Sequence, residues 1–331
     1  MSIVFNRCPC FLPLVSSLPC VSSKTILNKL FAQSIRASSE ASWSKISHAP
    51  ICTFSVEDLG VPLRKFLREN KGVFDGLPAD MYDVRREHIE FLQARQSQSS
   101  SNLIDLWRGY FLGNYNFSEI QPLYDVLSKK DREAFDAIKP YRFRAISRFQ
   151  LVNQNENFSL KRVSVKAFTQ SQSSIENKEE DWRKLSRVFS DLQEGHASLP
   201  TFRATLLGIA EKVKQVSPSL RKLDIVVHHV KVKTTADRIR GNSPEGIHQD
   251  GYPFLVTALV VERKGVSGGE SLIFDSDKVS QVFKTTLRPG QGLLQPDLNT
   301  KLWHYVTPIE PVKAHQEGIR SIIGFDIDVE M

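Results

Sequence analysis

Cysteine is scarce in this chain of 331 residues, and its placement excludes two kinds of site. Three of the four cysteines, Cys8, Cys10 and Cys20, lie within the first 50 residues, which leaves Cys52 alone in the rest of the chain. Residues 51–331 therefore cannot form an intrachain disulfide or a cysteine-based zinc site. Any metal bound by this part of the chain must be held by histidine and carboxylate side chains.

Long hydrophobic runs and a strong charge on the main body are also missing. No apolar stretch approaches the 18 residues of a membrane span, so we expect none. The formal net charge is +7, but residues 1–50 hold five of the 44 basic and only one of the 37 acidic residues. The remaining residues have a net charge of only +3, which argues against a nucleic-acid partner. A hydrophobic content of 40% fits a globular protein with a sizeable core.

The first 50 residues contain a single acid, Glu40. They are rich in serine with scattered lysine and arginine, a composition typical of an organelle transit peptide. The serine content favours the chloroplast, whereas "KTILNKLFAQSIR" could form a basic amphipathic helix of the mitochondrial kind. We therefore expect a chloroplast protein, with the mitochondrion as the alternative destination and a disordered cytosolic N-terminus as the alternative structure.

Residues 51–331 show helical patterns first and strand patterns later. Apolar spacing predicts helices within 54–140, which begin at a capping-box pattern of Ser55 and Asp58, and again within 181–216. A strand is expected at 141–152, and short β-branched runs after Pro218 predict roughly six more strands. The sequence thus predicts an α+β fold in one domain, with a helical part over 54–140 and an antiparallel β core mainly over 141–168 and 219–331.

The stretch "EGIHQDGYPF", residues 245–254, carries the first chemical signal. His248 and Asp250 lie two positions apart, so on a strand both side chains face the same way. His304 in "KLWHYVTPIE" is a candidate third ligand from a distant strand. Two histidines and one carboxylate on one face of an octahedral ion are the arrangement of non-haem Fe(II) oxygenases. Arg320 in "GIRSIIGFDI" could hold the second carboxylate of a 2-oxo acid with its planar fork.

Four segments in this order, "EGIHQDGY", "SGGESLIFD", "LWHYVTPI" and "GIRSIIGFDI", resemble the 2-oxoglutarate/Fe(II) dioxygenase family that includes bacterial free L-isoleucine hydroxylases. The resemblance covers residues 140–328. It implies a double-stranded β-helix, or jelly roll, with His248, Asp250 and His304 as ligands of Fe(II) and Arg320 as the partner of 2-oxoglutarate. The implied activity is hydroxylation of a small molecule, with a free amino acid as the expected substrate, by dioxygen and with release of succinate and CO2.

Other interpretations of these residues stay open on the sequence alone. His248 and Asp250 could form an ordinary polar turn, His304 could be a buried structural histidine, and Arg320 could form a surface ion pair. His315 could replace His304 as the third ligand. His228 and His229 lie in a predicted strand, so one of them must face inward. We expect these histidines to pack in the core or to support the metal ligands rather than to bind the metal themselves.

The residues that would bind the substrate are predicted from strand alternation. Arg142, Arg144 and Arg148 share one face of the strand at 141–152 and could anchor a carboxylate, unless they form an exposed basic edge. Tyr252 could line the mouth of the pocket or simply pack. The alternative function is a non-catalytic jelly-roll protein that binds a metal or small molecule as a sensor or scaffold. An oxygenase acting on nucleic acid is disfavoured by the low charge of the main body.

Overall fold

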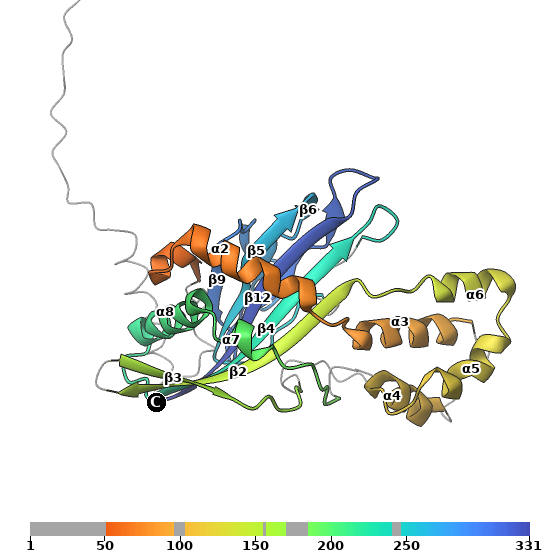
Figure 1. The fold of residues 1–331 in the computed structure, drawn as a ribbon, viewed down its shortest axis with the longest axis horizontal. Helices are drawn as coiled ribbons and strands as arrows, with labels where there is room; N and C mark the ends of the chain where they lie inside the picture. The colour runs from red at the N-terminus through yellow and green to blue at the C-terminus, as the bar shows by residue number, and fades with distance from the viewer. Residues whose placement is uncertain (1–50, 96–102, 155–156, 170–184, 240–245) are drawn as a thin grey trace, which may run out of the picture.

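A computed structural model describes residues 51–95, 103–154, 157–169, 185–239 and 246–331. It combines helices with antiparallel sheets, as the α+β prediction requires (Figure 1). The predicted transit peptide lies outside the described residues. The helices are η2 (Val56–Leu59), α2 (Leu63–Lys71), η3 (Gly72–Gly76), α3 (Met81–Gln93), α4 (Ile104–Leu112), α5 (Phe117–Asp125), α6 (Lys129–Asp136), α7 (Glu194–Ala197) and α8 (Pro200–Val216).

Twelve strands are present in the described part of the chain. They are β1 (Cys52–Ser55), β2 (Arg142–Gln154), β3 (Asn157–Val163), β4 (Lys222–Thr234), β5 (Phe254–Lys264), β6 (Val266–Gly268), β7 (Ser271–Phe274), β8 (Gln281–Thr285), β9 (Gln291–Pro296), β10 (Trp303–Val306), β11 (Ile309–Pro311) and β12 (Gly318–Glu330).

The strands form one large sheet and two small ones. The large sheet has the order β1-β9-β5-β12-β4-β2-β3, and every neighbouring pair in it is antiparallel. The small sheets have the orders β10-β7-β8 and β11-β6. An isolated bridge between His248 and His304 adds the segment before β5 to the free side of β10.

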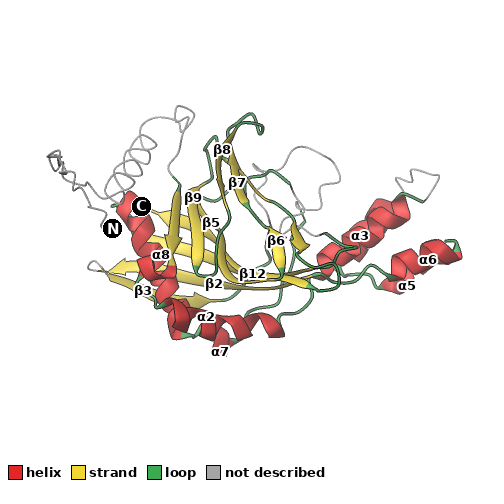
Figure 2. Cartoon of the chain, turned by 90° about the horizontal axis from the view of Figure 1, so that it is seen from above, coloured by secondary structure: helices red, strands yellow, loops and turns green. Residues whose placement is uncertain are grey.

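The two faces of the large sheet have different roles because successive side chains of a strand alternate between them. On β12, Ile323, Phe325 and Ile327 join the main hydrophobic core, whereas Ile322 joins a second core on the opposite face. That second core also contains Ile273 of β7 and residues of the loops nearby, so the small sheets close over this face. Figure 2 shows β7 and β8 on the opposite side of the large sheet from α2 and α8.

Helix α8 covers the face of the large sheet that carries the main hydrophobic core, which we call the outer face, because its sequence has an apolar stripe. Phe202, Leu206, Ile209 and Val213 are fully buried and recur at helical spacing. Pro200 occupies the first turn, where its missing N–H costs no hydrogen bond. The helix lies with α2 across the sheet, and its residues pack in the main core with those of β4 and β12 (Figure 2).

Helices α3 to α6 form a separate layer beside the sheets. In both views they extend away from the end of the large sheet (Figures 1 and 2). They have a hydrophobic cluster of their own, which includes Ile89, Trp107, Phe111, Ile120 and Phe135. We call helices α3 to α6 the helical unit, and its cluster explains why these helices, far from the main core, can stay folded.

One predicted helix is absent from the described part of its span. The apolar spacing of "DWRKLSRVFSDLQEG" predicts a helix over 181–195, but no residue of 185–193 is helical and only the short α7 follows. This segment runs beside β2, where Ile146 N–H donates to the carbonyl of Ser190 and Leu192 N–H donates to that of Ile146. The prediction was wrong because β2 needs hydrogen-bond partners along this edge, and the local pattern does not record that need.

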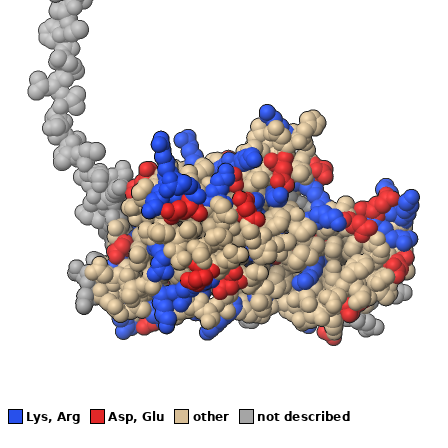
Figure 3. Space-filling model, in the orientation of Figure 1, with Lys and Arg blue, Asp and Glu red and all other residues tan. Residues whose placement is uncertain are grey.

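No helix among the described residues is long and apolar enough to span a membrane. On the face shown in Figure 3, lysine and arginine are interspersed with aspartate and glutamate rather than gathered over a single element.

Candidate metal centre

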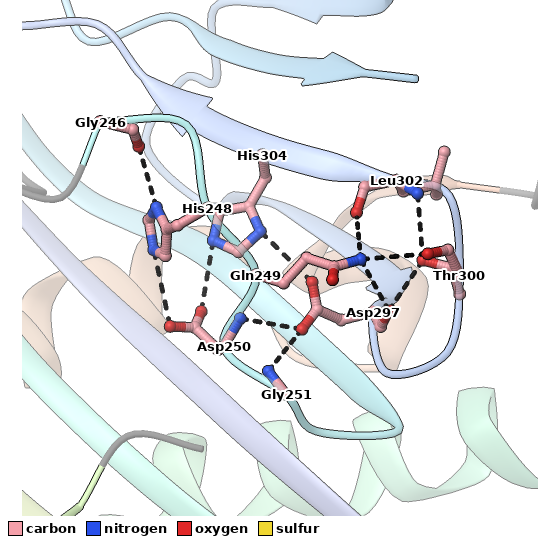
Figure 4. Close-up of polar contacts among 9 residues, drawn as sticks. All are labelled: Gly246, His248, Gln249, Asp250, Gly251, Asp297, Thr300, Leu302 and His304. Carbon is pink, nitrogen blue, oxygen red and sulfur yellow. Dashed lines mark hydrogen bonds and ion pairs between the residues drawn. The ribbon is translucent and has the colours of Figure 1, made fainter. Parts of the chain in front are cut away.

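His248 and His304 are brought together by backbone hydrogen bonds between two segments. The N–H of His248 donates to the carbonyl of His304 over 3.0 Å, and the N–H of His304 donates to that of His248 over 2.9 Å. This pairing places the two imidazoles side by side, with ring centroids 4.3 Å apart. The sequence predicts that His248 and Asp250 face the same way, and the structure adds that His304 is the bridge partner of His248 (Figure 4).

The carboxylate of Asp250 lies against both imidazoles. Its Oδ1 is 3.5 Å from Nε2 of His248, and its Oδ2 is 3.3 Å from Nε2 of His304. One ligand atom from each of the three residues lies within 4.8 Å of the other two, and both histidines are buried. Two imidazole nitrogens and a carboxylate oxygen gathered at one point are a suitable donor set for a divalent transition metal.

The other ring nitrogen of each histidine is held by a separate group, which orients the ring. Nδ1 of His248 lies 2.9 Å from the carbonyl of Gly246, so Nδ1 carries the proton and Nε2 is left as the donor atom. Nδ1 of His304 lies 3.5 Å from Oδ1 of Asp297. A carboxylate or carbonyl behind a metal-binding histidine is the usual way in which proteins fix its tautomer and raise its basicity.

Asp297 and Gln249 hold the loop between β9 and β10 against the metal centre. Oδ2 of Asp297 accepts hydrogen bonds from the N–H groups of Asp250 and Gly251, at 2.9 and 2.7 Å. The side-chain amide of Gln249 donates to the carbonyls of Asp297, Thr300 and Leu302 (Figure 4). Sequence reasoning missed both residues, although Gln249 lies between two predicted ligands.

The charges at the centre fit a bound cation. Burial alone would raise the pKa of Asp250, but the adjacent His248 and His304 hold that pKa well below its usual value. Burial would lower the pKa of His304, yet its contacts with Asp250 and Asp297 raise it to about 10. The protein thus favours a positive charge between these carboxylates, and a divalent ion can supply that charge in place of the histidine proton.

Arg320 is buried on the inner face of β12, and no carboxylate among the described residues pairs with it. Its side chain is 0% exposed, and its three guanidinium nitrogens have no hydrogen-bond partner among the described residues. Burial, together with the nearby Arg263, lowers the pKa of Arg320 to about 9. A buried guanidinium of this kind requires an anion to complete its hydrogen bonds, and a carboxylate matches its planar fork.

The space beside Arg320 depends on Gly269. A Cβ atom at that position would lie 3.0 Å from Cδ and Nε of Arg320 and 3.0 Å from Nη1 of Arg263. Arg263 is the cross-strand neighbour of Arg320 on β5, and its Nη2 donates to the carbonyl of Gly268. Its Nη1 is buried without a hydrogen-bond partner in the described part of the chain. Two guanidinium groups therefore border the place where an anion would bind.

A cavity adjoins the metal centre on the inner face of the large sheet. Its lining includes His248 and Asp250 and a set of further charged or polar side chains, namely Arg142, Arg144, Arg187, His228 and Asp326. The sequence prediction that one of the two adjacent histidines faces inward is confirmed. His228 lines the cavity, whereas His229 packs against Phe74 and Phe202 on the helix side.

The predicted substrate residues occupy different surroundings. Arg142 lines the cavity, but Asp80 and Asp83 lie 2.8 and 2.9 Å from its guanidinium. Arg144 lines the cavity and contacts His228. Arg148 forms a two-pronged pair with Asp224. It borders a neighbouring hollow, whose lining also contains Tyr252.

The alternative third ligand and the missed residues can also be placed. His315 is exposed in the turn before β12, and His304 rather than His315 joins the cluster. Arg187 and Asp326 were missed by sequence reasoning. Asp326 lies six positions after Arg320, and this even spacing on one strand places both on the same face, a signal that was available.

A family model described as 2OG-Fe dioxygenase matches residues 122–326. Among solved structures, a BsmA homolog from Methylobium petroleophilum PM1 is 19% identical with a TM-score of 0.58, covering 87% of this chain and 91% of that one. IDO from Bacillus thuringiensis is 14% identical with a TM-score of 0.55, covering 97% and 100%. At these identities the two structures show likeness of fold alone. A search of curated proteins gave no match.

Proposed function

Because this chain belongs to the 2OG-Fe dioxygenase family, we propose that its Fe(II) is bound by His248, Asp250 and His304 and its 2-oxoglutarate by Arg320. The family match, which covers more than half of the chain, makes the protein a 2-oxoglutarate-dependent dioxygenase with Fe(II) and 2-oxoglutarate as cofactors. The observation that carries the residue assignment is the convergence of these three ligands, from segments more than fifty positions apart, on one point in the fold.

Each residue has a defined task in the proposed reaction. Fe(II), when bound with 2-oxoglutarate and dioxygen, supplies the oxidising power for hydroxylation of a C–H bond, with succinate and CO2 as co-products. His248, Asp250 and His304 would hold the metal with two imidazole nitrogens and one carboxylate oxygen. Arg320 holds the distal carboxylate of 2-oxoglutarate through charge-assisted hydrogen bonds. The apolar side chains around Ile273 and Ile322 keep water away from this end of the site.

The proposed substrate is a small molecule, specifically a free amino acid. The resemblance of the His248 and Arg320 segments to bacterial L-isoleucine hydroxylases supports this class. Arg144 supports it as well, because this residue lines the cavity next to Asp250 and offers a cation for a substrate carboxylate.

The proposed fold of the catalytic core is the double-stranded β-helix. The strand order supports this topology, because β9, β5, β12 and β4 lie in one sheet and β10, β7 and β8 in the other. The bridge between His248 and His304 then supplies a fourth short strand to the smaller sheet. We take residues 51–331 as a single domain organised around this core.

The proposal is tested by measuring succinate release from 2-oxoglutarate with Fe(II), across a panel of free amino acids and small organelle metabolites. His248→Ala and His304→Ala are expected to abolish turnover because each removes a metal ligand. His315→Ala is the matched control, since that histidine is exposed and outside the cluster. Full activity of His248→Ala would refute the metal assignment, and absence of succinate with every compound would favour a non-catalytic binding protein.

Residues 1–50 are proposed to direct the protein to the chloroplast, on the basis of their serine content and near absence of acids. Fusion of this segment to a fluorescent protein tests the address. Signal in mitochondria would select the alternative destination, and signal in the cytosol would reject the transit peptide.

A further inference from the structure

The cavity beside the metal centre contains a chain of three polar side chains that the metal and Arg320 do not use. Arg144 of β2, His228 of β4 and Asp326 of β12 come from three adjacent strands of the large sheet. Nη2 of Arg144 lies 2.6 Å from Nδ1 of His228, and Nε2 of His228 lies 2.8 Å from Oδ2 of Asp326. All three line the cavity together with His248 and Asp250.

The contacts of His228 fix its protonation. A guanidinium can only donate hydrogen bonds, so Nδ1 of His228 accepts from Arg144 and has no proton. The single ring proton is therefore on Nε2 and is donated to Asp326. Burial lowers the pKa of His228, which agrees with a neutral ring. A neutral imidazole in this position holds a cation on one side and an anion on the other without cancelling either charge.

Arg144 differs from Arg142 in its surroundings. Arg142 has two carboxylates, Asp80 and Asp83, within 3 Å and is neutralised inside the protein. Arg144 instead has the neutral His228 as a hydrogen-bond partner, and its buried Nε has none among the described residues. Its guanidinium lies 4.1 Å from the ring centroid of Phe189, a contact that orients the group without supplying an anion.

A second guanidinium lies on the same aromatic pair. The guanidinium carbon of Arg187 is 5.4 Å from the ring of Phe168 and 5.7 Å from that of Phe189, and Arg187 lines the cavity. This part of the cavity thus holds the guanidinium groups of Arg142, Arg144 and Arg187, and Asp80 lies close enough to interact electrostatically with all three. Asp326 also lines the cavity, where its Oδ2 accepts from Nε2 of His228 and its Oδ1 accepts no hydrogen bond from the described residues.

We propose that these side chains determine substrate specificity: Arg144, with Arg187 beside it, binds the carboxylate of an α-amino acid, and Asp326 binds its ammonium group. His228 acts as a positioning residue that holds Arg144 and Asp326 at the separation of the two charges. The inference rests on the proposed function, since it concerns the substrate of the same site. It implies that the uncharged lining, which includes Val230, Leu255 and Ile322, accommodates the side chain of that amino acid.

The test compares three versions of one compound. Succinate release is measured with each of the twenty protein L-amino acids, and then with the carboxamide and the deaminated acid of the best of them. The carboxamide lacks the negative charge and the deaminated acid lacks the positive one. The wild-type enzyme should prefer the amino acid over each analogue by about 100-fold in kcat/KM, because each analogue leaves a buried charge of the site unpaired.

The variants are expected to lose one preference each. Arg144→Gln should lose the preference over the carboxamide and retain that over the deaminated acid, and Asp326→Asn should do the reverse. A purely structural role would not produce this crossed pattern. If Arg144→Gln does not fold, Arg144→Lys keeps the charge without the fork and should raise KM for the amino acid more than for the carboxamide.

Matched controls lie on the same two strands. Arg148→Gln and Asp328→Asn change residues that border the neighbouring hollow, and both should retain the two preferences. Unchanged preferences in Arg144→Gln and Asp326→Asn would overturn the inference, as would 2-oxoglutarate turnover that none of the twenty amino acids stimulates. Absence of succinate under every condition would instead overturn the proposed function, and the inference with it.

Discussion

Gly269 decides how much space is left around Arg320. Its φ of +63° lies in the left-handed region, and a Cβ there would meet Arg320 and Arg263 at 3.0 Å. Gly265 has nearly the same φ, +62°, but a Cβ there would find its nearest neighbour, the carbonyl of Glu317, at 3.7 Å. Alanine at either position would therefore lose a similar amount of stability to its left-handed backbone conformation. Only at Gly269 would its Cβ also be crowded by neighbouring side chains.

Gly269→Ala is expected to weaken 2-oxoglutarate binding by about 10-fold, because the guanidinium of Arg320 must shift and its bonds to a carboxylate depend on direction. Gly265→Ala should lose similar stability without this effect. Calorimetric titration of 2-oxoglutarate into the Mn(II)-loaded variants measures the difference. Equal affinity in the two variants would mean that Arg320 does not contact the cosubstrate.

At the scale of an element, Gln249 is one of the two side chains that hold the loop between β9 and β10 against the metal centre. Gln249 donates to three carbonyls of this loop, which leads directly into the strand that carries His304. The position of the third proposed ligand thus depends on a residue that binds no metal itself.

Gln249→Ala is expected to reduce Mn(II) affinity by about 10-fold, the usual scale for loss of a group that orients a metal ligand. Gln150→Ala removes an amide of the same size from β2, where it donates to Asp224, and should leave affinity unchanged. Mn(II) titration of both variants provides the comparison. An unaltered affinity in Gln249→Ala would show that β10 is positioned by its strand pairing alone.

The helical unit contains a half-buried histidine that makes its stability depend on pH. His88 stacks on Phe135 with ring centroids 4.2 Å apart, and its Nδ1 lies 2.8 Å from the hydroxyl of Tyr110. Burial, reinforced by Lys139, lowers the pKa of His88 to about 4. In the unfolded chain the pKa is about 6.5, so between these values the unfolded state takes up a proton that the folded state does not.

The free energy of unfolding should therefore fall as the pH drops from about 6.5 towards 4. At pH 5 we expect a loss of about 1 kcal/mol relative to His88→Gln, after allowance for partial exposure. Urea unfolding of both proteins at pH 7.5 and pH 5 measures this difference, with His315→Gln as an exposed control. Parallel pH profiles for wild type and His88→Gln would contradict the half-buried neutral histidine.

For the whole molecule, the metal centre joins parts of the chain that are distant in sequence. The three proposed ligands connect the segment before β5 to β10, so a bound ion stabilises the folded state and not the unfolded one. Mn(II) at 100 times its Kd should raise the free energy of unfolding by ~2.7 kcal/mol. His248→Ala should show no such increase in denaturant titrations. An equal increase in that variant would place the metal elsewhere.

Some features of this protein follow from its sequence alone. The alternation of β12 assigns Ile323 and Phe325 to the outer core and Arg320 to the inner face, because a strand can place side chains in only two directions. The proximity of His248 and Asp250 also follows from the sequence, because the two residues are only two positions apart. Helix α8 was predictable from its apolar stripe, since burial of that stripe is the main source of its stability.

Other features were decided only by the tertiary structure. Arg142, Arg144 and Arg148 share one face of β2 and are equivalent in sequence, yet Arg142 pairs with Asp80 and Arg148 with Asp224, while Arg144 contacts a neutral histidine. The partners are Asp80 at the N-cap of α3 and two residues of β4, all of them distant from β2 in the sequence. Which charge stays available for a ligand is fixed by long-range contacts, and a local pattern contains no information about them.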